Sequence, residues 1–289
     1  MITKNVAGIF GSGSNHWVGD GFPVRNLFPS NGVSTEIDPF LMLDYAGPTH
    51  FGPAKRPRGV GEHPHRGFET VTIAYQGAVD HRDSGGNSGT IRPGDVQWMT
   101  AGSGVVHEEK HEAEFTRQGG VFEMIQLWVN LPKAYKMSAP RYQAITSEQI
   151  PAVELGEAGR ARVVAGELEG VRGPAKTFTP INVFDVRLNA GHKAVLNLPE
   201  GHNAAVVLLK GHVGLDSSHE IKGEAQLALL SASGERVALE AREDSTLLVL
   251  SGEPIGEPVA SYGPFVMNTQ EELVTAVNDY NAGRMGRLQ

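Results

Sequence analysis

The sequence predicts an all-β protein made of two sets of short strands, and three observations support this. Turn-forming residues are frequent, with 36 glycines and 17 prolines among 289 residues. Short β-branched or alternating runs lie between them. The same strand-rich pattern then appears a second time along the chain. Short strands separated by turn signals roughly every 8–12 residues are typical of β-sandwiches and β-barrels. The length suits two domains, each with its own core.

The first set of runs ends near Leu131, and a segment with two prolines and little alternation follows it. The second set covers roughly residues 161–252. We therefore expect an N-terminal domain over 1–133, a connector over 134–160 and a C-terminal domain over 161–289. The runs that carry this expectation are FETVTIAY (68–75), TIRPGDVQWMT (90–100), INVFDVRL (181–188), AAVVLLKG (204–211) and STLLVLSG (245–252).

One helix is expected near the end of the chain, at about residues 269–283. Thr269 and Glu272 have the spacing of a capping box, and Gly283 stands where a helix C-terminus favours glycine. An apolar stripe runs between these signals, so the helix should pack on one of the β domains. The stripe consists of Leu273, Val274, Val277 and Tyr280.

Composition excludes several classes of function. The net charge of −8, without a Lys/Arg-rich run, argues against direct binding of nucleic acid. No apolar run approaches the roughly 20 residues of a membrane span, and the first residues lack the pattern of a secretory signal. We therefore expect a cytoplasmic protein that binds no membrane. Because cysteine is absent, any metal must be held by His, Asp or Glu.

Two pairs of residues have the spacing of metal ligands. His63 and His65 flank Pro64, and His107 stands two residues before Glu109. Either pair alone is weak evidence, because eleven histidines give about 0.4 His-x-His pairs by chance. On a strand, however, residues i and i+2 project to one face about 6.6 Å apart, which lets both side chains reach one ion.

A barrel could bring the two pairs together. The residues between them suffice for three or four short strands, and Pro64 holds its neighbourhood extended. Three imidazoles and one carboxylate suit Fe, Ni, Cu, Mn or Zn. The second set of strands shows no such spacing, because its histidines at 192, 202, 212 and 219 are ten, ten and seven residues apart. We expect no equivalent site there.

At these residues the sequence resembles the pirin family, a branch of the cupin superfamily. The resemblance rests on HPHRGFETVTIAYQGAVDHRDSGG and PGDVQWMTAGSGVVHEE, and it extends to HWVGDGF, DPFLMLD and GEPIGEPVASYGPFVMNTQEEL. It implies a bicupin, two antiparallel barrels with one metal in the N-terminal barrel. It also implies that His63, His65, His107 and Glu109 are the metal ligands. Iron is the metal implied, with nickel, copper, manganese, cobalt and zinc as alternatives.

The resemblance leaves two functions open, because some bacterial pirins resemble quercetin 2,3-dioxygenase in activity and other pirins are described as regulators. In the first, the protein opens a flavonol ring with O₂ and releases carbon monoxide. Glu109 then acts as the catalytic base for the flavonol 3-hydroxyl. In the second, the metal sets the surface that binds a protein partner, according to its redox state. A cavity that opens onto the metal would favour the enzyme.

A purely structural zinc is a third interpretation, disfavoured because two barrels of this size have ample core without a metal. Two further histidines lie near the expected ligands. We expect His81 to be a strand-end histidine with local partners, with a role behind a metal ligand as the alternative. We expect His111, which lies in a charged segment, to be at the surface.

Overall fold

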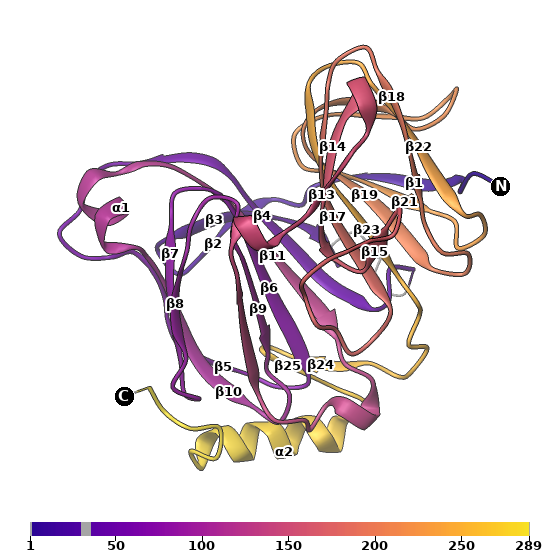
Figure 1. Cartoon of the computed structure of the whole chain (residues 1–289). Coiled ribbons are helices and arrows are strands. Elements are labelled where there is room, and N and C mark those ends of the chain that lie inside the picture. Colours follow the sequence, from indigo (N-terminus) through magenta and orange to yellow (C-terminus); the bar gives the residue numbers. More distant parts are fainter. Residues whose placement is uncertain (1, 30–35, 289) are drawn as a thin grey trace. The chain divides into compact units, whose positions relative to one another are not determined.

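Residues 2–29 and 36–288 are described in the computed structural model, whose contacts divide the chain into two compact units (Figure 1). The N-terminal barrel unit consists of Asn15–Arg25, Leu41–Ser147 and Ile255–Gln289. The C-terminal barrel unit consists of Met1–Ser14, Asn26–Phe40 and Glu148–Pro254. The predicted all-β class, with two cupin barrels and a C-terminal helix, is confirmed.

Two antiparallel sheets form the N-terminal barrel in the described part of the chain. The larger has the order β12-β9-β6-β11-β4-β3-β2 and the smaller the order β5-β10-β7-β8. Side chains of both sheets meet in one core, for example Phe122 and Met124 of β11 with Val79 of β7. The strands of the two sheets are β2 (Asn15–Val18), β3 (Phe22–Phe28), β4 (Phe40–Phe51), β5 (Gly59–His65), β6 (Phe68–Gln76), β7 (Val79–Asp83), β8 (Ser88–Ile91), β9 (Val96–Thr100), β10 (Val105–His111), β11 (Gly120–Asn130) and β12 (Arg141–Ile145). Strands β24 (Ala260–Tyr262) and β25 (Phe265–Met267) pair with each other in a separate small sheet.

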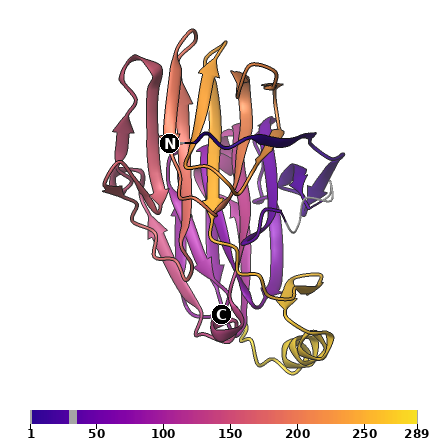
Figure 2. The ribbon, with the colours of Figure 1, turned by 90° about the vertical axis from the view of Figure 1, so that its right-hand side faces the viewer.

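One large sheet forms most of the C-terminal barrel, with its strands side by side in Figure 2. Its main order is β1-β21-β19-β23-β17-β14-β13, and β18, β20 and β22 join it. The strands of this unit are β1 (Val6–Gly11), β13 (Ala152–Glu154), β14 (Gly159–Ala165), β15 (Glu167–Leu168), β16 (Val171–Arg172), β17 (Ile181–Leu188), β18 (Lys193–Asn197), β19 (Asn203–Gly214), β20 (Glu220–Gly223), β21 (Gln226–Leu230), β22 (Arg236–Ala241) and β23 (Ser245–Gly252).

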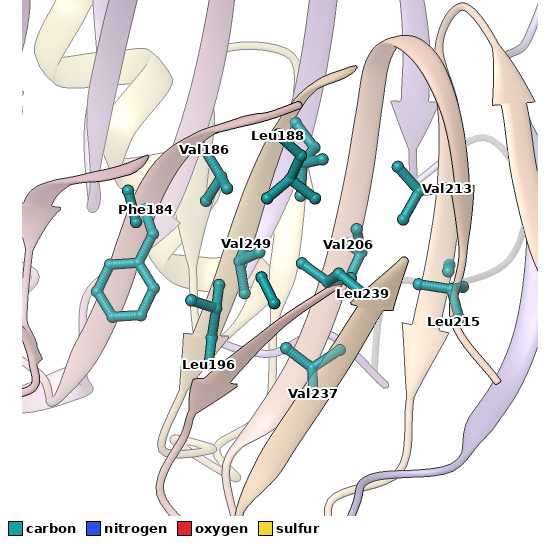
Figure 3. Close-up of a cluster of buried hydrophobic side chains, with 14 of the residues drawn as sticks. Phe184, Val186, Leu188, Leu196, Val206, Val213, Leu215, Val237, Leu239 and Val249 are labelled. Carbon is teal, nitrogen blue, oxygen red and sulfur yellow. The ribbon is translucent and has the colours of Figure 1, made fainter. Parts of the chain in front are cut away.

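Aliphatic side chains fill the interior of the C-terminal barrel (Figure 3). Phe184, Val186 and Leu188 alternate along β17 and point into this core, as residues two apart on a strand must. Val206 of β19 and Val249 of β23 meet them there. This barrel therefore has a packed hydrophobic core where the other barrel gathers polar residues.

The helices are short except the last. In the described residues they are α1 (Ala113–Gln118), α2 (Gln270–Asn281) and three 3₁₀ turns at Lys133–Tyr135, Ser147–Gln149 and Gly156–Ala158. The predicted capping box of α2 is present, with Thr269 accepting from the Glu272 amide. Leu273 is buried, but Val274 and Tyr280 are 61% and 37% exposed and Ala276 takes a buried position, so the expected stripe was wrong at Val274 and Tyr280. None of the helices among the described residues is both long and apolar enough to span a membrane.

The two ends of the chain belong to the unit formed mainly by the other half. Strand β1 pairs with β21 in the C-terminal barrel unit. Helix α2 packs on β24 and β25 and belongs to the N-terminal barrel unit. The domain boundaries expected at residues 133 and 161 stay a prediction. The compact units show in addition that the N-terminal strand belongs to the C-terminal barrel unit and the C-terminal helix to the N-terminal barrel unit.

Candidate metal centre

Three histidines converge inside the N-terminal barrel. Strand β10 lies between β5 and β7, and His107 of β10 is directly opposite His63 of β5. His65 lies two residues beyond His63 and faces the same way. The ring centroids are 4.2 Å apart for His63 and His107, 4.8 Å for His63 and His65, and 4.9 Å for His65 and His107. One nitrogen from each ring lies within 4.8 Å of the other two, as a shared metal requires.

Backbone carbonyls orient two of these rings. The Nδ1–H of His63 donates to the Gly61 carbonyl oxygen at 2.8 Å, and the Nδ1–H of His65 donates to that of Pro264 at 3.4 Å. A carbonyl can only accept, so each ring carries its proton on Nδ1. The Nε2 atom of each ring then keeps a free lone pair. A histidine ligand typically donates its other N–H in this way.

His107 provides the test of whether the residues fit a metal. Its side chain is fully buried, and its Nε2 atom has no hydrogen-bond partner. A buried nitrogen without a partner costs free energy, and a metal ion bound to its lone pair would remove this cost. Burial, followed by the charges of the neighbouring histidines, lowers the pKa of both His65 and His107 well below the ordinary value. Both rings are therefore neutral at pH 7, the form that binds a metal.

Glu109 lies next to this group rather than within it. It follows His107 on the inward face of β10 and forms a second group of candidate ligands with His107 and His81. Its Oε1 atom is 3.3 Å from the Thr72 hydroxyl, which also lies 3.1 Å from Gln126 Oε1. The structure thus brings three of the four expected ligands together and places the fourth beside one of them.

A β-bulge interrupts the pairing of β5 with β10 between His107 and Glu109. His107 pairs with His63, but Glu109 pairs with Val60, so two residues of β5 oppose the single residue Glu108. Such a bulge bends the strand and re-aims its side chains. Here the result is that an apolar side chain, that of Val60, stands opposite Glu109 and lines the cavity described below.

His81 was expected to have only local partners, and this was wrong in one respect. It is 3% exposed, and its Nδ1 lies 3.4 Å from Nδ1 of His107. Its Nε2 lies 3.5 Å from Oδ2 of Asp83, and the Tyr142 ring stacks on it at 5.0 Å. Burial raises the pKa of Tyr142 to about 12, with the charges of Asp83 and Glu109 acting in the same direction. His81 therefore lies directly behind an expected ligand.

His111 was expected at the surface, and the structure corrects this. The side chain is 2% exposed, its Nε2 lies 2.9 Å from the Gly21 carbonyl, and its ring stacks on Phe122. Burial lowers its pKa against the opposing effect of that hydrogen bond. Of its charged neighbours, Lys110 is on the other face of β10 and Glu112 lies beyond the strand, where it caps α1, which is why the segment looked like a strand exit.

A cavity of about 410 Å³ opens beside the histidines. Its wall contains His63, His65 and Glu109, and the rest of the wall is largely apolar. The other lining residues are Val18, Phe22, Val24, Met42, Asp44, Val60, Met124, Gln126, Trp128 and Pro264. Two hollows of about 530 and 550 Å³ occur in the C-terminal barrel unit, but no group of three candidate ligands in the described residues lies there.

The C-terminal segment completes this side of the barrel. Pro264 lines the cavity and supplies the carbonyl that His65 uses. Arg66 binds the segment in two ways: its guanidinium donates to Asp279 of α2 at 2.8 Å, and its backbone carbonyl accepts from the Val266 amide at 3.0 Å. The sequence did not predict this contact, because about 200 residues separate Arg66 from Asp279.

Comparison with known proteins agrees with this architecture. The family model "Pirin" matches residues 21–129, and "Pirin C-terminal cupin domain" matches residues 183–286. A Pseudomonas aeruginosa protein named "Putative quercetin 2,3-dioxygenase" is 55% identical over 98% of this chain and 99% of its own length. A tomato (Solanum lycopersicum) protein named "Pirin-like protein" is 39% identical over 93% of this chain and 88% of its own length.

Solved structures give the same result. The crystal structure of a quercetin 2,3-dioxygenase from Acinetobacter baumannii is 51% identical, covers 99% of this chain and 100% of its own, and superposes with a TM-score of 0.96. The bacterial pirin YhhW of Escherichia coli, solved in complex with nickel(II), is 18% identical over 86% of this chain and 100% of its own, with a TM-score of 0.62, and shares the fold. The chain belongs to the pirin family of bicupin proteins.

Proposed function

We propose that this pirin-family protein is a metal-dependent dioxygenase that acts on a flavonol such as quercetin. In this proposal His63, His65, His107 and Glu109 hold one divalent metal, with Fe(II) the proposed ion. The names of the relatives in Pseudomonas and Acinetobacter support the reaction class. The observation that carries the proposal is the cavity, because a site for a rigid aromatic substrate must adjoin the metal ligands.

The size and lining of the cavity suit a flavonol. Small-molecule sites commonly measure roughly 300–1,000 Å³ and are largely apolar with a few polar groups. This cavity measures about 410 Å³, with Trp128, Met42 and Met124 offering flat or adaptable apolar surface. Its polar groups include His63, His65 and Glu109, three of the four residues proposed to bind the metal. The substrate hydroxyls would therefore meet the metal ligands at that end of the cavity.

Each proposed ligand has a distinct part. His63 and His65 present Nε2 because backbone carbonyls hold their Nδ1 protons. His107 presents a buried nitrogen that has no other partner. Glu109 would turn its carboxylate from Thr72 toward the three imidazoles. Iron bound there would lower the pKa of an approaching hydroxyl and supply the redox chemistry that O₂ requires.

Glu109 is proposed to be the base as well as a ligand. Its carboxylate lines the cavity, where it can accept the proton of the flavonol 3-hydroxyl. An imidazole that binds a metal through Nε2 and donates its Nδ1–H has no free position for a proton. The Nδ1–H partner is a carbonyl for His63 and His65 and His81 for His107, so these histidines cannot take this part. Glu109→Gln should therefore retain most of the metal and lose most of the turnover. Full turnover by the Gln variant would contradict the role of base.

Oxygen uptake with quercetin tests the proposed function. We expect uptake by the iron-reconstituted protein, none by the metal-free protein, and none by His65→Ala. His212→Ala is the matched control, since His212 pairs with Glu220 in the C-terminal barrel unit, and it should behave as the wild type. Fully metallated protein without uptake would contradict the enzyme. That outcome would instead favour a regulator that binds proteins, to be tested by partner capture in the ferrous and ferric states.

A further inference from the structure

Two residues outside the proposed ligand set are built into the wall behind His107. His81 and Asp83 lie on the same face of β7, directly across from Glu109 and His107 of β10. Their side chains are 0% and 2% exposed. A line of close polar contacts runs from His107 Nδ1 to His81 Nδ1 at 3.4 Å, and from His81 Nε2 to Asp83 Oδ2 at 3.5 Å.

The acceptor at the end of this line fixes the proton positions along it. An ionised Asp83 can only accept, so the facing Nε2 of His81 carries a proton. His81 in its neutral form then has a lone pair on Nδ1 and accepts from Nδ1–H of His107. His107 is thereby left with a lone pair on its buried Nε2, the atom that has no protein partner. The opposite arrangement would put a proton on that atom and block a metal.

The surroundings hold both residues in this geometry. Asp83 Oδ1 accepts from the backbone amides of Gly85 and Asn87 at 2.9 and 3.0 Å, and Asn87 Nδ2 donates to both carboxylate oxygens. The Tyr142 ring stacks on the other side of His81 with an interplanar angle of 19°. Neither His81 nor Asp83 lines the cavity whose wall contains His63, His65 and Glu109. The hydrogen-bond contact of His81 with the proposed ligands is made to His107, and His81 also lies opposite Glu109 on the neighbouring strand.

We propose that Asp83 and His81 form a two-step hydrogen-bond relay that fixes the tautomer of His107 and so prepares its Nε2 for metal binding. Both are positioning residues. This inference rests on the proposed metal site, and it goes beyond the four expected ligands. A purely structural pair that joins β7 to β10 would stabilise the fold without changing metal affinity, which separates the two interpretations.

Asp83→Asn is the decisive variant. The amide oxygen can keep the bonds from Gly85 and Asn87, but the amide nitrogen would face His81 as a donor. His81 would then carry its proton on Nδ1 and force the wrong tautomer on His107. Loss of a hydrogen-bond partner behind a metal ligand typically costs about 10- to 100-fold in affinity, and we expect a loss of that size here. Asp80→Asn is the control, with the same charge change on the same strand at a residue bonded to Thr90.

A second pair of variants tests His81 itself. In His81→Asn, the side-chain amide can place its oxygen where Nδ1 stood and accept from His107, so affinity should stay within a few-fold of the wild type. In His81→Leu no acceptor remains, and the affinity should fall as in Asp83→Asn. If His81 were itself a metal ligand, Asn would weaken binding as much as Leu. Combined with His81→Asn, the Asp83→Asn change should have no further effect, because the relay no longer reaches residue 83.

The measurement is the dissociation constant of Co(II), by competition with a chelator, together with the visible absorption of bound Co(II). Thermal unfolding of each metal-free variant shows whether it has folded. Asp83→Asn and His81→Leu with wild-type affinity and absorption would overturn the relay alone. Equal losses from Asp83→Asn in the wild-type and His81→Asn backgrounds would also overturn it. Wild-type protein that binds no Co(II) would overturn the metal site and the relay together.

Discussion

His107 and His63 face each other across the β5–β10 pair with their ring centroids 4.2 Å apart, although 44 positions separate them in the numbering of the sequence. The register of one strand pair therefore brings the two predicted pairs of ligands together. A one-residue slip would turn one ring to the other face of the sheet. The proposed centre thus depends on the same hydrogen bonds that form the barrel.

Metal binding should stabilise the folded protein through His107. A ligand present at 100 times its dissociation constant adds about 2.7 kcal/mol to the free energy of unfolding. Saturating Co(II) should therefore raise the unfolding temperature of the wild type by several degrees, as scanning calorimetry would record. His107→Phe, which keeps a ring of similar size, should show no rise. An equal rise in both proteins would remove His107 from the ligand set.

The metal-free protein should lose stability as the pH falls below about 6.5. Burial lowers the pKa of His65 and His107 in the folded state, so the unfolded chain binds more protons than the folded chain below the ordinary histidine pKa. Stability is then fully present above that pKa and falls with decreasing pH, by at most about 1.4 kcal/mol per pH unit for each histidine. Urea unfolding at pH 7.5, 6.5 and 5.5 measures this slope. In metal-free His107→Phe, the free energy of unfolding should depend less steeply on pH. An identical pH dependence would show that His107 does not contribute to it.

Arg66 should stabilise the C-terminal segment far more than Arg284 does. Both arginines donate to Asp279, but the side chain of Arg66 is 4% exposed and that of Arg284 is 59% exposed. Arg66→Ala should lower the free energy of unfolding by about 1.5–3 kcal/mol, the range for a hydrogen bond to a charged group. Arg284→Ala should cost less than about 1 kcal/mol, as exposed ion pairs do. Denaturant titration of the two variants decides this, and equal costs would contradict a buried anchor at Arg66.

Filling the cavity should impair catalysis without removing the metal. Val60→Phe adds a ring to the wall opposite Glu109, where the proposed substrate lies. We expect kcat/KM for quercetin to fall roughly 10-fold or more, because the added ring would occupy space that the substrate needs in the cavity. Metal content should remain that of the wild type. Val195→Phe, at a residue 51% exposed in the other barrel, is the matched control. Unchanged kcat/KM in Val60→Phe would place the substrate elsewhere.

The i, i+2 spacing predicted which side chains share a strand face, and the resemblance to the pirin family implied that His63, His65 and His107 converge. Residues two apart on a strand share a face, and one strand pairing then brings the faces together. Glu109 obeys the same rule on β10, but the bulge in β5 moves its partner to Val60. A bulge is a local change of register that alternation does not reveal. The position of Glu109 beside, rather than within, the group of three therefore had no signal in the sequence.

Long-range contacts account for most of what the sequence did not predict. The carbonyl of Pro264 reaches His65 from about 200 residues away, and nothing near either residue indicates that contact. His111 was misplaced because its charged neighbours do not share its face: Lys110 alternates to the other face of β10 and Glu112 caps α1, whereas His111 continues the buried face of His107 and Glu109. His81 and Asp83 did carry a signal. They repeat the i, i+2 spacing of the ligand pairs on the adjacent strand.

Carbon monoxide release per O₂ consumed tests the central claim most directly. Quercetin can be oxidised by O₂ without ring opening, so oxygen uptake alone does not identify the reaction. The account predicts that iron-loaded protein consumes O₂ and releases carbon monoxide in equal amounts as quercetin disappears. It also predicts that Glu109→Gln with bound iron does neither at a comparable rate. Oxygen consumption without carbon monoxide from the fully iron-loaded wild type would contradict the proposed dioxygenase.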